Sequence, residues 1–209
     1  MTAVSPAASG TQQTAGFLII ALSMVEMFTI PKDYFVLGSI VSTSSMALVA
    51  FLLTGFKGLF RPKIIYFVLA VAGAVFLYVV FLGGNLAIRA LNIPDLSASG
   101  EQNIYGLFSG VSLPLLIVVL ILDAVGFESY FRGNLLGAFS KRIGVFSVPL
   151  VAGMDAAIHL ATLNPLFPAT TFVADLVWSA YFYKTRDLTT TILFHFLWDL
   201  LIFVIFPIR

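Results

Sequence analysis

The chain has 209 residues, of which 60% are hydrophobic and 10% are charged, with 21 phenylalanines and no cysteine. So few charges in so apolar a sequence exclude a water-soluble globular protein and predict a polytopic membrane protein. A formal net charge of +1 gives no reason to expect a nucleic-acid partner. Without cysteine there are no disulfides and no thiolate ligands, so any bound metal would need nitrogen and oxygen ligands.

Residues 1–15 are small, polar and uncharged, and we expect a disordered tail there. Residues 16–209 are predicted to form a single domain of transmembrane helices, because only helices and closed barrels satisfy the backbone in lipid. Hydrophobic spans are predicted at 16–31, 34–56, 64–88, 105–124 continuing to about 139, 144–163, 169–183 and 188–208. The expected fold is an all-α bundle of six transmembrane helices, or seven if the short first span crosses completely.

The loops predict how the bundle is oriented. Seven of the eleven basic residues fall in alternate loops, and basic loops mark the cytoplasmic side of a membrane: Lys57, Arg61, Lys63, Lys141, Arg142, Lys184 and Arg186. With seven crossings the N-terminus lies in the cytoplasm, and losing the first crossing would move only the N-terminus. We expect a multi-pass protein of the cell membrane, surrounded by lipids.

Ionisable residues lie inside these apolar spans, where they are costly and are by default read as a functional site. Both histidines and six acidic residues are placed this way: His159, His195, Glu26, Asp123, Glu128, Asp155, Asp175 and Asp199. Glu26 is isolated near Pro31 and is expected to make only local contacts. For Asp175, a helix-to-helix hydrogen bond and a place in the site wall are equally good interpretations.

Helical spacing groups most of the others into pairs. Residues four apart project from one helix face, and three acid–base pairs have this spacing: Asp155 with His159, His195 with Asp199, and Glu128 with Arg132. A carboxylate and a guanidinium one turn apart in an apolar helix neutralise each other. We therefore assign Glu128 and Arg132 to the architecture first, and the two histidine pairs to chemistry.

The same residues resemble the motifs of a known family. The run FESYFRGNLLGAF (127–139) is similar to the E-E-x-x-x-R motif of the CPBP intramembrane proteases, which include the CAAX prenyl endopeptidases and the bacteriocin-processing Abi proteins. DAAIHLATLNP (155–165) resembles the family's F-x-x-x-H helix, and HFLWD (195–199) matches H-x-x-x-(N or D). YFYKTRDLTTTILFH (181–195) is similar to the lead-in to the last motif, so the resemblance covers about residues 111–205.

Two positions depart from the family's pattern. Phe127 stands where the family has the glutamate that activates the attacking water, and Asp155 stands where it has phenylalanine. Our hypothesis is that Asp155, or Asp123 one helical turn before Phe127, supplies the missing carboxylate.

The resemblance also implies roles. A carboxylate would polarise a water with help from His159, while His195, oriented by Asp199, would stabilise the oxyanion; Glu128 completes the catalytic set, and Arg132 and Asp123 support it. His159, His195 and Asp155 are the candidate ligands if the enzyme uses zinc, although a mechanism without metal is equally compatible. The implied substrate is a membrane-tethered protein or peptide, of which prenylated tails are one kind.

Two other functions stay open at this stage. Loss of the water-activating glutamate favours a family member without peptidase activity, which binds a membrane protein partner as an accessory subunit. Carboxylates and histidines in membrane spans also build proton or ion pathways, but no pair of broken helices recurs in two halves of the chain as transporter repeats would show.

Helix geometry raises one difficulty for a shared site. At about 1.5 Å per residue from the loop at Lys141, His159 should lie toward the outer leaflet, whereas His195 should lie nearer the cytoplasmic side. The two side chains would then be far apart, and a separation above about 10 Å without a closing motion would exclude a common site.

Overall fold

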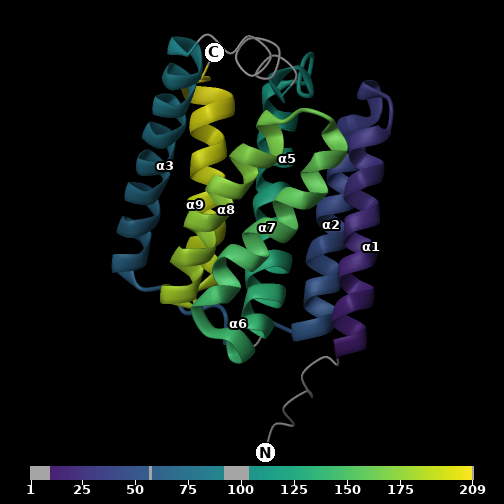
Figure 1. The fold of residues 1–209 in the computed structure, drawn as a ribbon, viewed down its shortest axis with the longest axis vertical. Coiled ribbons are helices and arrows are strands. Elements are labelled where there is room, and N and C mark those ends of the chain that lie inside the picture. Colours follow the sequence, from purple (N-terminus) through teal and green to yellow (C-terminus); the bar gives the residue numbers. More distant parts are fainter. Residues whose placement is uncertain (1–9, 57, 92–103, 209) are drawn as a thin grey trace, which may run out of the picture.

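The computed structural model describes residues 10–56, 58–91 and 104–208, and the regular structure within these ranges is entirely helical. The main helices lie side by side in one bundle (Figure 1): α1 (Gly10–Thr29), α2 (Phe35–Thr54), α3 (Ile64–Ala90), α5 (Leu113–Phe127), α7 (Ser147–His159), α8 (Leu166–Thr185) and α9 (Leu188–Leu200). A short helix, α6 (Gly137–Ile143), lies at the end of the bundle where α1 begins. The predicted all-helical fold is confirmed.

Four stretches are long and apolar enough to cross a membrane: Lys32–Thr54, Ile64–Ala90, Leu113–Thr162 and Leu188–Ile205. The third contains a reversal of direction, because Gly144 adopts a φ of 58° between α6 and α7. Helices α5 and α7 consequently run in opposite directions through the bundle (Figure 1). The chain is a polytopic membrane protein, while six or seven crossings, the cell membrane and a cytoplasmic N-terminus stay predictions.

The first helix begins earlier than the sequence suggested. Helix α1 starts at Gly10, so residues 10–15 are helical and not part of a tail; the rest of the predicted tail, residues 1–9, lies outside the described residues. Packing accounts for the longer helix: the Gln13 side-chain amide donates to Oδ1 of Asn134 at 2.9 Å, and Gly16 is buried. Asn134 thus stabilises the first turns of α1, which the sequence did not predict as helix because residues 10–15 are mostly polar or small.

Two apolar clusters hold the bundle together. One joins α1, α2, the segment after α5, and α7, with Met24, Met46, Phe131 and Val151 among its buried side chains. The other joins α3, α8 and α9 around buried aromatic residues such as Trp178. Large apolar side chains also cover the outside of the bundle, which suits a surface in contact with lipid.

Helix α5 continues into a π-helical stretch, Glu128–Leu136, in which all nine residues are buried. A π-helix has i→i+5 hydrogen bonds and is frequently found at functional sites. This stretch packs against α2, α7, α8 and α9. It therefore carries the charged residues of the first motif into the middle of the bundle, where only protein groups can neutralise them.

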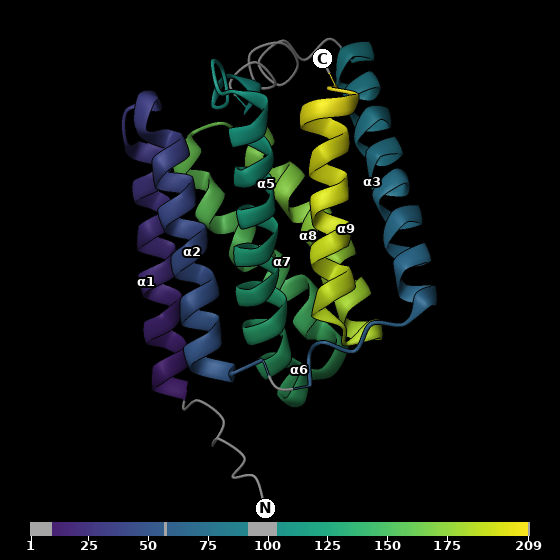
Figure 2. The same ribbon diagram turned by 180° about the vertical axis from the view of Figure 1, so that it is seen from behind.

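The end of the bundle that contains the start of α1 is basic, and we call it the basic end. The α2–α3 connection, α6 and the α8–α9 turn lie there together, as both sides of the molecule show (Figures 1 and 2). They carry the described basic loop residues: Arg61, Lys63, Lys141, Arg142, Lys184 and Arg186. Lys57, predicted to belong with them, lies outside the described residues.

Asp187 joins two segments of the basic end by hydrogen bonds. Its fully buried carboxylate accepts hydrogen bonds from the backbone N–H of Thr190 at 3.0 Å, the Thr190 hydroxyl at 2.7 Å and the backbone N–H of Arg61 at 2.8 Å. The Leu188 N–H donates to the carbonyl of Leu59 at 2.7 Å. The N-terminus of α9 is thereby capped and bonded to the α2–α3 connection.

Candidate active site

A cavity of about 400 Å³ lies between the helices and extends toward the end of the bundle opposite the basic end. Its walls are mainly apolar and aromatic. The ionisable residues that line it are six of the eight that the sequence placed in apolar spans: Asp123, Asp155, His159, Asp175, His195 and Asp199. We call this space the site cavity.

His195 projects from α9 and is held from both sides. Its Nδ1 lies 2.8 Å from Oε1 of Glu128, and its Nε2 lies 3.4 Å from Oδ2 of Asp199. The indole of Trp178 stacks on the imidazole with ring centroids 3.8 Å apart. The sequence predicted only Asp199 as the orienting partner, whereas Glu128, on another helix, makes the shorter contact.

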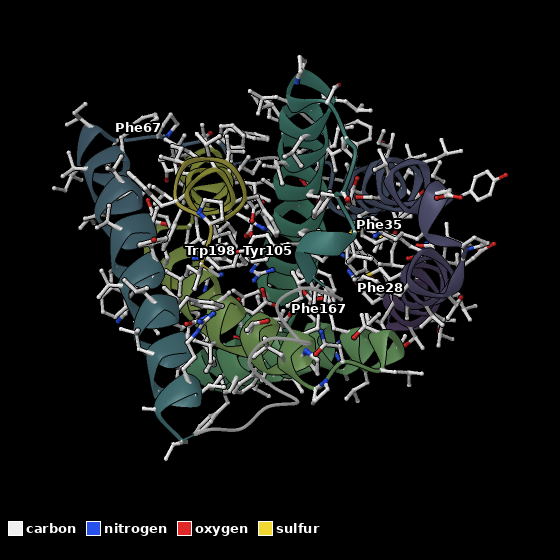
Figure 3. All side chains as sticks on the ribbon, turned by 90° about the horizontal axis from the view of Figure 1, so that it is seen from above. Phe28, Phe35, Phe67, Tyr105, Phe167 and Trp198 are labelled. Carbon is white, nitrogen blue, oxygen red and sulfur yellow. The ribbon has the colours of Figure 1, made fainter. Side chains whose placement is uncertain are left out.

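His159 lies at the end of α7 and is held from one side. Its Nδ1 lies 3.0 Å from the backbone oxygen of Asp155 and 3.3 Å from the Oδ1 of the same residue. Rings of Phe28 and Phe167 pack against the imidazole, with centroids 5.1 and 5.2 Å away (Figure 3 labels both phenylalanines). No hydrogen bond to Nε2 is formed by the described residues, which leaves this nitrogen free for a ligand in the cavity.

Phe127 lies between the two histidines. Its ring centroid is 6.2 Å from that of His159 and 6.2 Å from that of His195. Counting residues in a straight helix predicted separate depths for the histidines, but the 3-10 turn Gly144–Phe146 follows α6, and α7 begins only at Ser147. The structure thus brings both histidines to one cavity, with the departure from the family motif between them.

Arg132 is the buried cation behind this site, with a side chain that is 0% exposed. Its Nε lies 3.3 Å from Oε2 of Glu128, and its Nη2 donates to Oδ1 of Asp175. Asp175 therefore satisfies both interpretations from the sequence, since it bonds to another helix and also lines the cavity. Glu128 connects Arg132 to His195, so the pair assigned to architecture also orients a site residue.

The two carboxylates proposed to replace the missing glutamate occupy different positions. Both carboxylate oxygens of Asp155 are buried without a hydrogen bond from the described residues, and one faces His159. Asp123 lines the cavity, accepts a 2.8 Å hydrogen bond from the hydroxyl of Ser39, and interacts electrostatically with both histidines. Asp155 is thus placed to act through His159, and Asp123 to act directly on a ligand.

Part of the site comes from the N-terminal half, to which the sequence assigned no chemistry. Phe28, Phe35 and Ser39 all line the cavity. A signal existed in α2, where Ser39, Ser42 and Thr43 form a buried polar stripe at helical spacing in an apolar span. Glu26 is exposed and lines a separate hollow, so the structure does not bring it to the site.

The zinc ligands suggested by the sequence do not form a ligand group in this arrangement. No three histidine, aspartate or glutamate residues of the described part of the chain are grouped so as to hold a metal ion. Both nitrogens of His195 face carboxylates, and His159 offers only Nε2.

Comparison with known proteins agrees with this geometry. Residues 109–201 match the family model described as type II CAAX prenyl endopeptidase Rce1-like. No curated protein and no solved structure matches the chain. The matched residues contain all three motifs and both histidines of the site. Residues 109–201 of the chain are therefore similar to the type II CAAX prenyl endopeptidases, as the motifs indicated.

Proposed function

We propose that this protein is an intramembrane endopeptidase in which His159, held by Asp155, activates the attacking water. The family match supports a CAAX-protease-like membrane protein at a coarse level. The observation that carries the proposal is the orientation of His159: Asp155 engages Nδ1 on one side, while Nε2 is left for the cavity. The backbone oxygen of Asp155 can accept only from an Nδ1–H, which fixes the tautomer and leaves Nε2 unprotonated, and the Asp155 carboxylate 3.3 Å away faces the same ring edge; an imidazole placed in this way can act as a general base.

The reaction follows from these positions. A water bonded to His159 Nε2 gives up a proton to the ring as its oxygen attacks the scissile carbonyl. The carboxylate of Asp155 stabilises the imidazolium that forms, and the ring then returns the proton to the leaving amine nitrogen. General-base assistance of this kind is worth about 10² to 10⁴ in rate. Asp155 replaces the lost glutamate indirectly, through its histidine.

His195 has the complementary role. In this role the ring is an imidazolium, which donates from both nitrogens. Its 3.4 Å contact with Asp199 is long for a hydrogen bond, so the oxyanion of the tetrahedral intermediate can take the place of that carboxylate at Nε2. Glu128 holds the ring from Nδ1 while this occurs. One such donor contributes about 2.7 to 4 kcal/mol to transition-state stabilisation. Asp123 and Ser39 form a second polar wall for the substrate or the water.

We propose a membrane-tethered protein or peptide as the substrate. The cavity is lined mostly by aromatic and aliphatic side chains, with four acids and two histidines among them. An apolar segment can enter such a cavity without leaving many of its own polar groups unpaired. Prenylated and unprenylated tails both fit this description.

A second candidate is a family member that binds such a segment without cleaving it, as an accessory subunit. The position of Phe127 favours this candidate, because an apolar ring fills the space between the histidines where a water-activating carboxylate would lie.

Cleavage assays with purified protein separate the two candidates. A panel of membrane peptides, with and without a prenyl group, is tested against wild type, His159→Ala, His195→Ala, Asp155→Asn and Asp123→Asn. Glu26→Gln is the matched control, since it removes an acid from a membrane helix outside the site. The proposal expects a loss of at least about 10²-fold for His159→Ala and unchanged cleavage for Glu26→Gln.

Three other outcomes are informative. The accessory function is the better explanation if the wild-type protein binds the peptides but cleaves none of them faster than the two histidine variants do. If Asp155→Asn and Asp123→Asn both leave hydrolysis intact, no relocated carboxylate exists. Metal analysis of the same samples tests zinc directly: activity that depends on stoichiometric zinc would replace the metal-free mechanism.

A further inference from the structure

The walls of the site cavity come from one end of the bundle. Toward its mouth it is lined by the last residues of α1 and α3, the first residues of α2 and α8, and the segment that leads into α5, including Phe28, Phe35, Ile88, Phe108 and Phe167. Viewed from this end, Phe28, Phe35, Tyr105, Phe167 and Trp198 lie around the centre of the bundle (Figure 3). We call this end the open end.

The basic end contributes nothing to the cavity. None of the residues that line it falls within 55–65, 128–150 or 180–192. The π-helical stretch Glu128–Leu136 fills the space between the histidines and the basic end, and every one of its residues is buried. The hydrogen bonds of Asp187 join the α2–α3 connection to α9 beneath it. A ligand therefore reaches His159 and His195 from the open end.

Charge distinguishes the two ends. The basic end carries six described basic loop residues, from Arg61 to Arg186. Among the described residues the open end carries Lys32 and Arg89, with Asp33 beside Lys32, and its connection at 160–165 has no charge at all. Excess basic residues in short loops remain on the cytoplasmic side during insertion. The closed end of the cavity is therefore the cytoplasmic one.

We infer that the site cavity opens to the non-cytoplasmic side of the membrane, and that it receives an extended apolar segment of a membrane-tethered polypeptide exposed on that side. The aromatic mouth suits apolar side chains, and the histidines lie deeper, where the chain would be cut. The cleavage part of this inference rests on the proposed function, whereas the direction of access does not. An outward-facing cavity excludes substrates whose cleavage site is confined to the cytoplasm.

The absence of cysteine makes the inference directly testable. Three single-cysteine variants are expressed in bacterial cells and treated with a membrane-impermeant maleimide: Leu163→Cys at the open end, where the side chain is 92% exposed, Lys141→Cys at the basic end, and Thr170→Cys in the cavity wall. We expect Leu163→Cys and Thr170→Cys to be labelled in intact cells. Lys141→Cys should stay at background until the cells are permeabilised.

The opposite pattern would overturn the inference. Labelling of Lys141→Cys in intact cells, with Leu163→Cys protected, reverses the orientation. Labelling of Leu163→Cys together with protection of Thr170→Cys until permeabilisation places the access route on the cytoplasmic side.

A second experiment tests the substrate side. Two co-expressed reporters carry the same apolar segment. One exposes the cleavage site outside the cell and the other exposes it in the cytoplasm, and the His159→Ala variant of the protein is the control. The inference expects cleavage of the outward reporter only, and cleavage of the inward reporter alone contradicts it. If labelling shows outward access and neither reporter is cut, the proposed protease function fails while the direction of access stands.

Discussion

Phe127 packs against His159 with the two ring centroids 6.2 Å apart, at the motif position where CPBP proteases have a glutamate. If Asp155 now serves the base, a carboxylate restored at position 127 should compensate for its loss. We expect Asp155→Asn to lose most activity and the double variant Phe127→Glu/Asp155→Asn to regain about tenfold or more, within the range that general-base help supplies. Initial cleavage rates on one peptide measure this.

Phe127→Gln/Asp155→Asn is the control, because glutamine is similar in size to glutamate but cannot accept a proton. Equal rates in the Glu and Gln double variants would show that the effect comes from polarity alone.

The buried ion pairs of Arg132 predict a large stability effect. Arg132→Met leaves the carboxylates of Glu128 and Asp175 without their buried cation. Removing one partner of a buried pair costs about 3 to 5 kcal/mol. Thermal unfolding in a fixed detergent should show a clear drop in Tm, and adding Asp175→Asn to Arg132→Met should recover part of it.

Lys63→Met serves as the control for loss of a cation, because this residue is exposed and should not change Tm. The Tm of Asp175→Asn alone is measured as well. If the loss of Tm in the double variant equals the sum of the losses in the two single variants, Arg132 and Asp175 do not stabilise each other.

Helix α5 approaches α2 closely at Gly126. A Cβ at this position would meet the carbonyl oxygen of Thr43 and lie 2.8 Å from its Cα, and backbone atoms cannot move aside as a flexible side chain can. We expect Gly126→Ala to destabilise the protein by about 1 to 3 kcal/mol through overpacking. Gly83→Ala in α3 is the matched control, since a Cβ there meets nothing within 4 Å. Equal Tm values for the two variants would contradict the close approach.

Asp187 predicts a capping effect at the basic end. Asp187→Ala removes the acceptor for the Thr190 N–H, the Thr190 hydroxyl and the Arg61 N–H. Loss of an N-cap costs about 0.5 to 2 kcal/mol, and the bond to Arg61 adds to that. We expect a lower Tm together with faster proteolysis of the α2–α3 connection, whereas Asp33→Ala, at an exposed residue of the short 3-10 helix Lys32–Tyr34, should leave both unchanged.

The sequence predicted the fold class and most of the ionisable residues that line the site cavity, because membrane burial makes polarity informative. His159, His195, Asp155 and Asp199 were found from helical spacing, since each pair shares one helix. Most helices from 34 onward begin and end within a few residues of the predicted spans, because lipid demands long apolar stretches, but α5 begins at Leu113 and not at 105.

Contacts between helices could not be predicted in this way. The bond between Glu128 and His195 joins two helices, and no spacing rule relates residues so far apart in the chain. The same holds for Ser39 with Asp123. The sequence predicted the loop at Lys141, but it began the next span at 144, whereas α7 begins at Ser147, so the depth of His159 was overestimated.

The π-helical stretch Glu128–Leu136 has a consequence for reading related sequences. Each hydrogen-bonded ring in it encloses one more residue than in an α-helix, so side chains after Leu136 are rotated relative to those before Glu128. A helical wheel drawn with uniform pitch from Leu113 to Ile143 would therefore assign the wrong face of α6 to the interior. Alignments of such proteins should keep the number of residues in this stretch fixed, because a single deletion within it would turn every following side chain away from its partner.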